Sequence, residues 1–201
     1  MELGLFPLGI VLLPTERVPL HIFEPRYREL IGECIEEELE FGLVFANEDG
    51  VRELGTLARV DEVLEQFDDG RMNIVVEGGE RFLVERLTHG RSFMTAEVLP
   101  VDDDGEEPLP AAVARATASF RALAAAAEAE AGDLDEESEQ LSFRLAAQVE
   151  LAPESKQELL ELRSEQRRLE LVAELLDGVR AVLIATRELG ERAKKNGSRL
   201  S

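Results

Sequence analysis

The sequence predicts an α+β fold in which a β-rich half precedes a helical half. Up to about residue 101, short apolar runs alternate with turn residues, as is typical of strands. From about residue 110, apolar residues recur at helical spacing, and an acidic segment at 101–108 separates the two patterns. We therefore expect a β-rich domain over residues 1–101, a helical subdomain over 110–190 and a flexible tail over 191–201.

The β-rich half is expected to form a meander or a small closed barrel that includes one helix. The turn Asp68–Arg71 contains Asp-Gly between two apolar runs, which is a strong hairpin signal. Val18–Phe23 is a predicted strand, and Pro19 confines it to a sheet edge or a bulge because proline lacks an N–H. Pro25 fits the first turn of a helix. The buried face of that helix is expected to contain Tyr27, Leu30, Ile31, Cys34, Ile35 and Leu39.

Four helices are expected in the second half, over 111–130, 141–151, 155–163 and 164–189. Pro153 is expected to end the second, Ser155–Glu158 has the form of a capping box, and Ser164 can cap the last. A heptad-like seam lies along the last helix, at Leu169, Val172, Leu176, Val179, Leu183 and Thr186. Either the helical subdomain itself or a second copy must cover it, and in the second case residues 177–189 form a homodimer contact.

Charge and composition narrow the classes of partner. The formal net charge is -21, and residues 101–140 alone carry 12 acidic and 2 basic side chains, so nucleic acid and anionic membrane are unfavourable partners. No apolar run approaches the roughly 18 residues of a transmembrane helix, and the N-terminus lacks the positive start of a secretory signal. One cysteine indicates a cytoplasmic protein. The excess of arginine over lysine indicates a GC-rich bacterial genome or a salt-adapted one.

No motif for catalysis or cofactor binding occurs in the sequence. A phosphate-binding loop with its lysine and a G-x-S-x-G nucleophile elbow are both missing. His21, His89 and Cys34 are too few and too scattered to predict a metal site. Cys34 is instead expected to be a buried apolar filler rather than a reactive thiol. The sequence thus predicts no enzyme, no cofactor and no metal, although scattered carboxylates leave acid–base chemistry open.

Three stretches in order resemble the N-terminal domain of the Lon protease family. The first runs from Leu5 to Leu30, and its Phe23-Glu24-Pro25-Arg26-Tyr27 is most similar to stand-alone members of the family. The second runs from Glu53 to Phe82, and the third comprises Lys156–Glu161 with Arg168–Glu170. The resemblance covers about residues 3 to 177. It implies a PUA-like β pseudo-barrel followed by an α-helical bundle.

The resemblance also implies a function, which is the binding of unfolded or extended polypeptides. In full-length members this domain helps to select protein substrates, and the ATPase and peptidase domains lie downstream of the part that this sequence matches. An alternative is a small hydrolase or another enzyme that uses the mouth of the barrel. Nucleic-acid binding is suggested only by the PUA-like fold and is opposed by the charge.

Two short segments are the candidate peptide-binding residues. In the first, an edge strand could accept a peptide by β-augmentation, and in the second, an aromatic and an arginine could form a binding lip. For both segments the competing interpretation is a purely structural role in helix initiation and packing. The candidate residues are Phe6, Pro7, Leu8, Phe23, Glu24, Arg26 and Tyr27.

Overall fold

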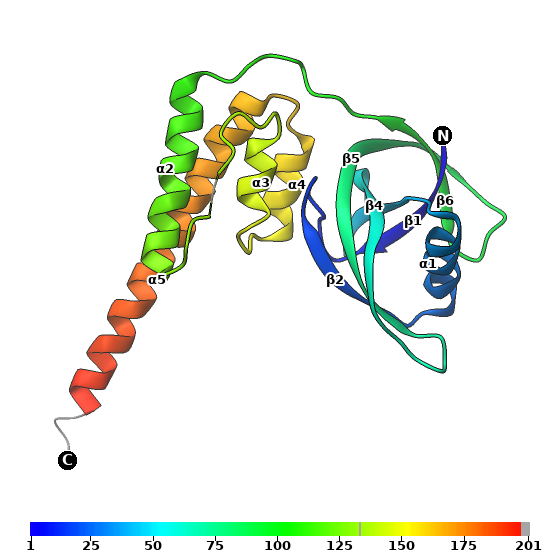
Figure 1. Cartoon of the computed structure of the whole chain (residues 1–201), viewed down its shortest axis with the longest axis horizontal. Coiled ribbons are helices and arrows are strands. Elements are labelled where there is room, and N and C mark those ends of the chain that lie inside the picture. Colours follow the sequence, from blue (N-terminus) through cyan, green and yellow to red (C-terminus); the bar gives the residue numbers. More distant parts are fainter. Residues whose placement is uncertain (133, 198–201) are drawn as a thin grey trace.

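The computed structural model describes residues 1–132 and 134–197 and shows strands and helices in two adjoining halves (Figure 1). The strands are β1 (Glu2–Leu8), β2 (Arg17–Ile22), β3 (Phe41–Asn47), β4 (Gly50–Gln66), β5 (Met72–Thr88) and β6 (Met94–Pro100). The helices are α1 (Pro25–Glu37), α2 (Pro110–Ala127), α3 (Leu141–Ala146), α4 (Pro153–Glu161) and α5 (Glu165–Gly197). The architecture is therefore α+β, as the sequence predicts.

The six strands form one mixed sheet in the order β2-β5-β4-β3-β1-β6. A further pairing between β5 and β6 joins the far side of this order back to β5, so the pairings of β1, β3, β4, β5 and β6 make a ring. Strand β2 lies outside the ring and pairs with the first part of β5. The ring agrees with the barrel-like arrangement expected from the sequence, and β2 is the edge strand that Pro19 predicts.

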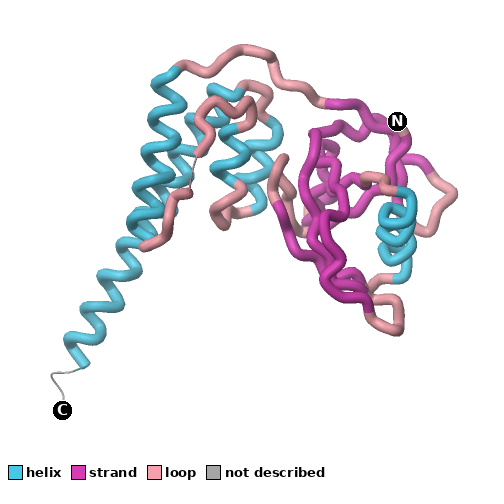
Figure 2. Tube along the Cα trace, viewed as in Figure 1, coloured by secondary structure: helices cyan, strands magenta, loops and turns pink. Residues whose placement is uncertain are grey.

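Helix α1 lies on the side of the strands away from the other helices (Figure 2). It begins at Pro25, whose fixed φ suits the first helical position. Its buried side chains are Tyr27, Leu30, Ile31 and Cys34. The predicted buried face of α1 was wrong toward the C-terminal end of the helix, because Ile35 and Leu39 are 38% and 49% exposed.

The helical half and the barrel share one apolar core. Val11, Leu13 and Phe45 come from the β-rich half and pack in the same buried cluster as side chains of α2, α3, α4 and α5. Each fully buried side chain of this size stabilises the fold by about 1.5–3 kcal/mol. The loop that follows β1 is therefore packed between the two halves, and it fixes the helices against the barrel.

Two helix boundaries differ from the sequence prediction around Pro153. The second predicted helix, 141–151, is shorter in the structure, because α3 ends at Ala146. Pro153 does not end that helix but begins α4, with Ala152 as its N-cap, so the capping box predicted at Ser155–Glu158 does not form. The reason is that proline at the first helical turn sacrifices no hydrogen bond and is pre-set for the helical φ.

Helix α5 is longer than predicted and extends past the end of α2 (Figure 1). Its 33 residues correspond to about 50 Å, and its backbone is helical to Gly197, within the region expected to be a flexible tail. Residues 198–201 lie outside the described part. Leu169, Val172 and Leu176 of the heptad-like seam are fully buried within the protein's own helices. The dimer contact through residues 177–189 stays a prediction.

Gly78 is expected to be sensitive to any side chain. A Cβ at this position would overlap the backbone carbonyl oxygen of Leu13, which crosses β5 there. We expect Gly78→Ala to lower the free energy of unfolding by about 1–3 kcal/mol, as overpacking does. Gly32 in α1 has open space around its Cα, so Gly32→Ala should raise the free energy of unfolding by about 0.5–1 kcal/mol. Urea unfolding monitored by circular dichroism measures both, and equal effects of the two substitutions would contradict this account.

Candidate functional site

The seven candidate residues separate into a buried pair and an exposed group. Phe6 is 4% exposed and Tyr27 is 6% exposed, and their ring centroids lie 4.1 Å apart within the core between the strands and α1. Pro7 and Leu8 are half-buried on β1, where they pair with β3. Phe6 and Tyr27 therefore contribute to packing, and their side chains are not available on the surface.

The exposed candidates lie where β2 ends and α1 begins. Phe23 is 59% exposed and its ring stacks on His21 with a centroid distance of 5.9 Å. Glu24 and Arg26 form an ion pair at 2.8 Å, and the Arg26 guanidinium lies 4.5 Å from the Tyr27 ring centroid. Of the predicted lip, Phe23, Glu24 and Arg26 are thus accessible to a ligand, and the exposed aromatic lies at the end of the edge strand.

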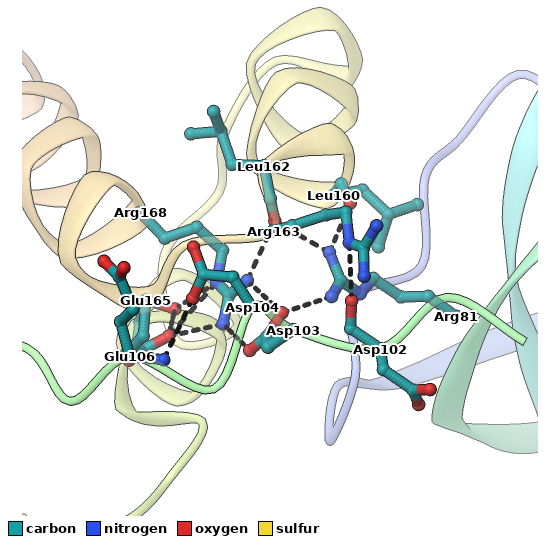
Figure 3. A network of polar contacts seen from close by, with 11 residues as sticks. Arg81, Asp102, Asp103, Asp104, Glu106, Leu160, Leu162, Arg163, Glu165 and Arg168 are labelled. Carbon is teal, nitrogen blue, oxygen red and sulfur yellow. Dashed lines mark hydrogen bonds and ion pairs between the residues drawn. The ribbon is translucent and has the colours of Figure 1, made fainter.

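A buried polar network joins the two halves, and the sequence analysis missed it (Figure 3). Arg168 of α5 is fully buried and donates to both carboxylate oxygens of Asp103, with 2.7 Å to Oδ1, and to the Leu162 carbonyl at 2.8 Å. Arg81 of β5 also donates to Asp103 Oδ1, and to the carbonyls of Leu160 and Leu162 at 2.8 and 2.7 Å. One aspartate of the linker therefore bridges a barrel strand and the longest helix.

Glu165 extends this network into α3. Its carboxylate accepts hydrogen bonds from the Ser142 N–H at 2.8 Å and the Ser142 hydroxyl at 2.6 Å, and it pairs with Arg168 at 2.6 Å. The ring of Phe143 lies under two guanidinium groups, with 4.4 Å to Arg168 and 5.5 Å to Arg81. Every polar group of Arg168 that burial removes from water thus has a partner in the protein.

The two carboxylates of the network have pKa values shifted in opposite directions. Burial raises the pKa of Glu165 above 4.5, and the hydrogen bonds from Ser142 and the charge of Arg168 offset only part of this. Burial also opposes ionisation of Asp103, but hydrogen bonds and charges from Arg168 and Arg81 outweigh it and lower its pKa below 3.8. Because both groups are engaged by arginines, their shifted pKa values are explained by structure without a catalytic role.

Two clefts open at the junction of the two halves, and the network lines the second. The first, the β2–α3 cleft, has a volume of about 780 Å³ and lies between the start of β2 and the α3 region. Its walls include Thr15, Glu16, Arg17, Arg144, Ala147 and Gln148. The second, the linker cleft, has a volume of about 1040 Å³ and follows the 101–108 segment. Both are lined by Ser138, Glu139 and Gln140, so that one segment separates them.

The charges of the linker cleft restrict what it can bind. Arg81 is the one basic residue on its wall, and its guanidinium is engaged by Asp103 and by backbone carbonyls. The acidic residues on the wall are Glu80, Asp102, Asp103, Glu106, Glu107, Glu136, Glu137, Glu139 and Glu165. This cleft is therefore unfavourable for phosphate groups.

The described residues contain little that could support metal or thiol chemistry. No group of three or more His, Cys, Asp or Glu side chains in this part of the chain is arranged to hold a metal ion. Cys34 is 5% exposed, and burial, followed by the charges of Glu33 and Glu37, raises its pKa to about 11. Among the helices that the structure describes, none combines the length and apolarity needed to cross a bilayer.

One strained residue lies at the edge of the β2–α3 cleft. Thr15 has a φ of 66°, a left-handed conformation that a β-branched side chain rarely adopts. Its N–H donates to the Gly78 carbonyl at 2.8 Å, and the next residue, Glu16, pairs with Lys156 of α4. These contacts hold the start of β2 between β5 and α4, and they set the direction in which β2 leaves the cleft.

The arrangement is that of an α+β domain in which a barrel-like sheet and a helical half enclose clefts at their junction. A model of the ATP-dependent protease La (LON) substrate-binding domain family matches residues 2–178. The chain therefore belongs to this family, which the sequence resemblance predicted.

Individual relatives agree with this assignment. A Lon protease of Brevibacillus choshinensis is 24% identical over 98% of this chain, and the chain spans 28% of the length of that relative. The crystal structure of a Lon N-terminal domain protein from Xanthomonas campestris has 28% identity and a TM-score of 0.65, with 85% of this chain and 95% of that chain covered. The N-terminal domain of the Mycobacterium avium complex Lon protease shares the fold at 19% identity and a TM-score of 0.67, with 88% and 98% covered.

Arg168 is expected to be essential for stability. In Arg168→Met, a similar volume is kept, but Asp103 and Glu165 lose their shared cation, so the free energy of unfolding should fall by about 3–5 kcal/mol. The neighbouring Arg167 is exposed, and Arg167→Met should change the free energy of unfolding by less than about 0.5 kcal/mol. Urea unfolding of the two variants tests this, and a wild-type midpoint for Arg168→Met would show that the network adds nothing.

Cys34 is expected to be unreactive in the folded protein. A pKa of about 11 in place of 9.0 lowers the thiolate fraction about 100-fold at neutral pH, and burial restricts access further. Ellman's reagent at pH 8 should therefore label the native protein very slowly and the urea-unfolded protein at once. Rapid labelling of fully folded protein would instead mean that α1 opens or that the thiol is accessible.

Proposed function

We propose that this protein binds unfolded or extended polypeptide segments. The observation that carries the proposal is the match of residues 2–178 to a substrate-binding domain family of a protease. The geometry supports the proposal in two ways. Strand β2 has a free edge that can pair with an extended chain, and Phe23 exposes an aromatic ring at the end of that edge.

Exposed apolar side chains elsewhere on the same sheet add further support. Val63 and Leu64 of β4 are 42% and 54% exposed, on the long hairpin that β4 forms with β5. Unfolded chains expose apolar side chains that a folded protein hides, so a surface of this type distinguishes the two states of a client protein. We infer selectivity for unfolded over native protein from this contrast.

An enzyme that uses the barrel mouth has less support. The carboxylates with shifted pKa values in the linker cleft, Asp103 and Glu165, are both held by Arg168. We therefore propose binding without ATP hydrolysis and without peptide cleavage.

The direct test measures binding of a fluorescently labelled, reduced and alkylated lysozyme, which cannot refold, against labelled native lysozyme. We expect the unfolded form to bind with a Kd on the order of 10–100 μM, the weak end of specific recognition, and the native form not to bind. ATP turnover and casein cleavage, assayed on the same preparation, should stay at the level of a buffer blank. Equal binding of both lysozymes, or of neither, would contradict the proposal.

A further inference from the structure

The free edge of β2 has backbone groups with no partner. β2 is the only strand among those described that pairs with a single neighbour, since β1, β3, β4 and β6 each pair with two strands and β5 pairs with three. An edge of this kind presents a row of N–H and C=O groups that another extended chain can satisfy. β-Bulges often protect such edges, but β2 has a regular register with β5 over all six residues.

The hydrogen bonds before β2 show which of its residues face outward. Gly78 donates its N–H to the carbonyl of Glu16 at 2.9 Å. Backbone groups of an antiparallel pair alternate between facing the partner and facing away, so Val18, Leu20 and Ile22 direct theirs to β5. The backbone N–H and C=O groups of Arg17, Pro19 and His21 therefore point away from β5, and we call these three residues the outward row. Pro19 supports this alternation, because proline has no N–H and its place in the outward row costs no hydrogen bond to β5.

The outward row leads into the β2–α3 cleft. Arg17, the first residue of β2, lines this cleft, and Arg144, Ala147 and Gln148 of the α3 region form the opposite wall. In Figure 1, β2 lies on the side of the barrel that faces the helical half. A chain that pairs with β2 would therefore continue into a cleft that already has room for it.

The side chains along β2 select the occupant. Val18 and Leu20 are half-buried against the core on one face of the strand, whereas Arg17, Pro19 and His21 are exposed on the other. An added strand would place alternate side chains beside each of these rows. Residues beside Val18 and Leu20 should therefore be apolar.

Charge selects against acidic segments. The formal net charge of the chain is -21, and Arg17 is already paired with Asp61 of β4. Glu139 lines the cleft into which the outward row leads, and the other charged residues on its wall, Glu16 and Arg144, pair with Lys156 and Asp135. The negative charge of the protein attracts a segment that has basic residues at the positions not facing Val18 and Leu20, and it repels an acidic segment.

The geometry points to β-augmentation at β2: an extended polypeptide, apolar at alternate residues and neutral or basic overall, adds as a further strand and enters the β2–α3 cleft. This inference rests on the proposed function and specifies its site and its preferred segment. It assigns the binding to the backbone of Arg17 and His21, which the sequence analysis did not select.

Amide hydrogen exchange, followed by NMR on the full chain, tests the site directly. The probes are a capped peptide of alternating lysine and valine and the unfolded lysozyme described above. We expect both to slow exchange at the N–H groups of Arg17 and His21. The N–H groups of Val18 and Leu20 should change little, because they already bond to β5. If the probes bind but the Arg17 and His21 amides exchange as in the free protein, the β2 site is wrong while polypeptide binding stands. If neither probe binds, the proposed function itself fails.

Two matched comparisons test the mode of binding. His21→Pro removes an outward N–H and blocks the edge, whereas His21→Ala removes the same ring and keeps the N–H, so the Kd of the proline variant should be about tenfold higher than that of the alanine variant. The second comparison uses two lysine–valine peptides that carry N-methyl groups on one or the other set of alternate amides. Their Kd values should also differ by about tenfold, since only one edge of an added strand faces β2.

Thermal unfolding controls for the fold of each variant. Equal affinity within both pairs would overturn β-augmentation, and a glutamate–valine peptide that binds as well as the lysine–valine peptide would overturn the charge preference.

Discussion

Asp103 accepts hydrogen bonds from two arginines that lie in different halves of the protein, Arg81 on β5 and Arg168 on α5. Taking a guanidinium out of water is costly unless each of its donors finds an acceptor, and Arg168 is fully buried. Its position is stable only while Asp103, Glu165 and the Leu162 carbonyl are in place together. The orientation of α5, the path of the linker and the shape of the linker cleft all depend on this condition.

The apolar core and the polar network have complementary roles in this junction. Val11, Leu13 and Phe45 bury apolar area against the helices, which favours association of the halves but is not directional. Hydrogen bonds of fixed geometry, such as the bidentate pair between Arg168 and Asp103, restrict the halves to one relative orientation. The clefts at the junction therefore have fixed walls, which reduces the conformational cost of binding a ligand there.

The sequence predicted those features that local chemistry determines. Pro19 indicated an edge strand, Pro25 indicated a helix start, and helical spacing identified Leu30 and Ile31 as buried. It did not predict the network, because composition does not distinguish Asp103 from its acidic neighbours in an apparently solvated linker. One signal was present, since Arg168 lies four residues before Val172 on the buried face of α5. Similarly, the sequence alone does not indicate that Gly78 accommodates the backbone of Leu13 within the continuous β5.

A strand edge that is free to receive another chain can also pair with the same strand of a second molecule, and this is the usual route to edge-to-edge aggregation. Pro19 removes the central N–H of the outward row, so two β2 strands placed side by side would lack hydrogen bonds at their middle. The formal charge of -21 adds repulsion between two copies but not between this chain and a basic segment. The electrostatic part of this protection weakens as the screening length falls from about 10 Å at 0.1 M salt to about 3 Å at 1 M. Colloidal stability of the protein is thus tied to ionic strength through one short strand.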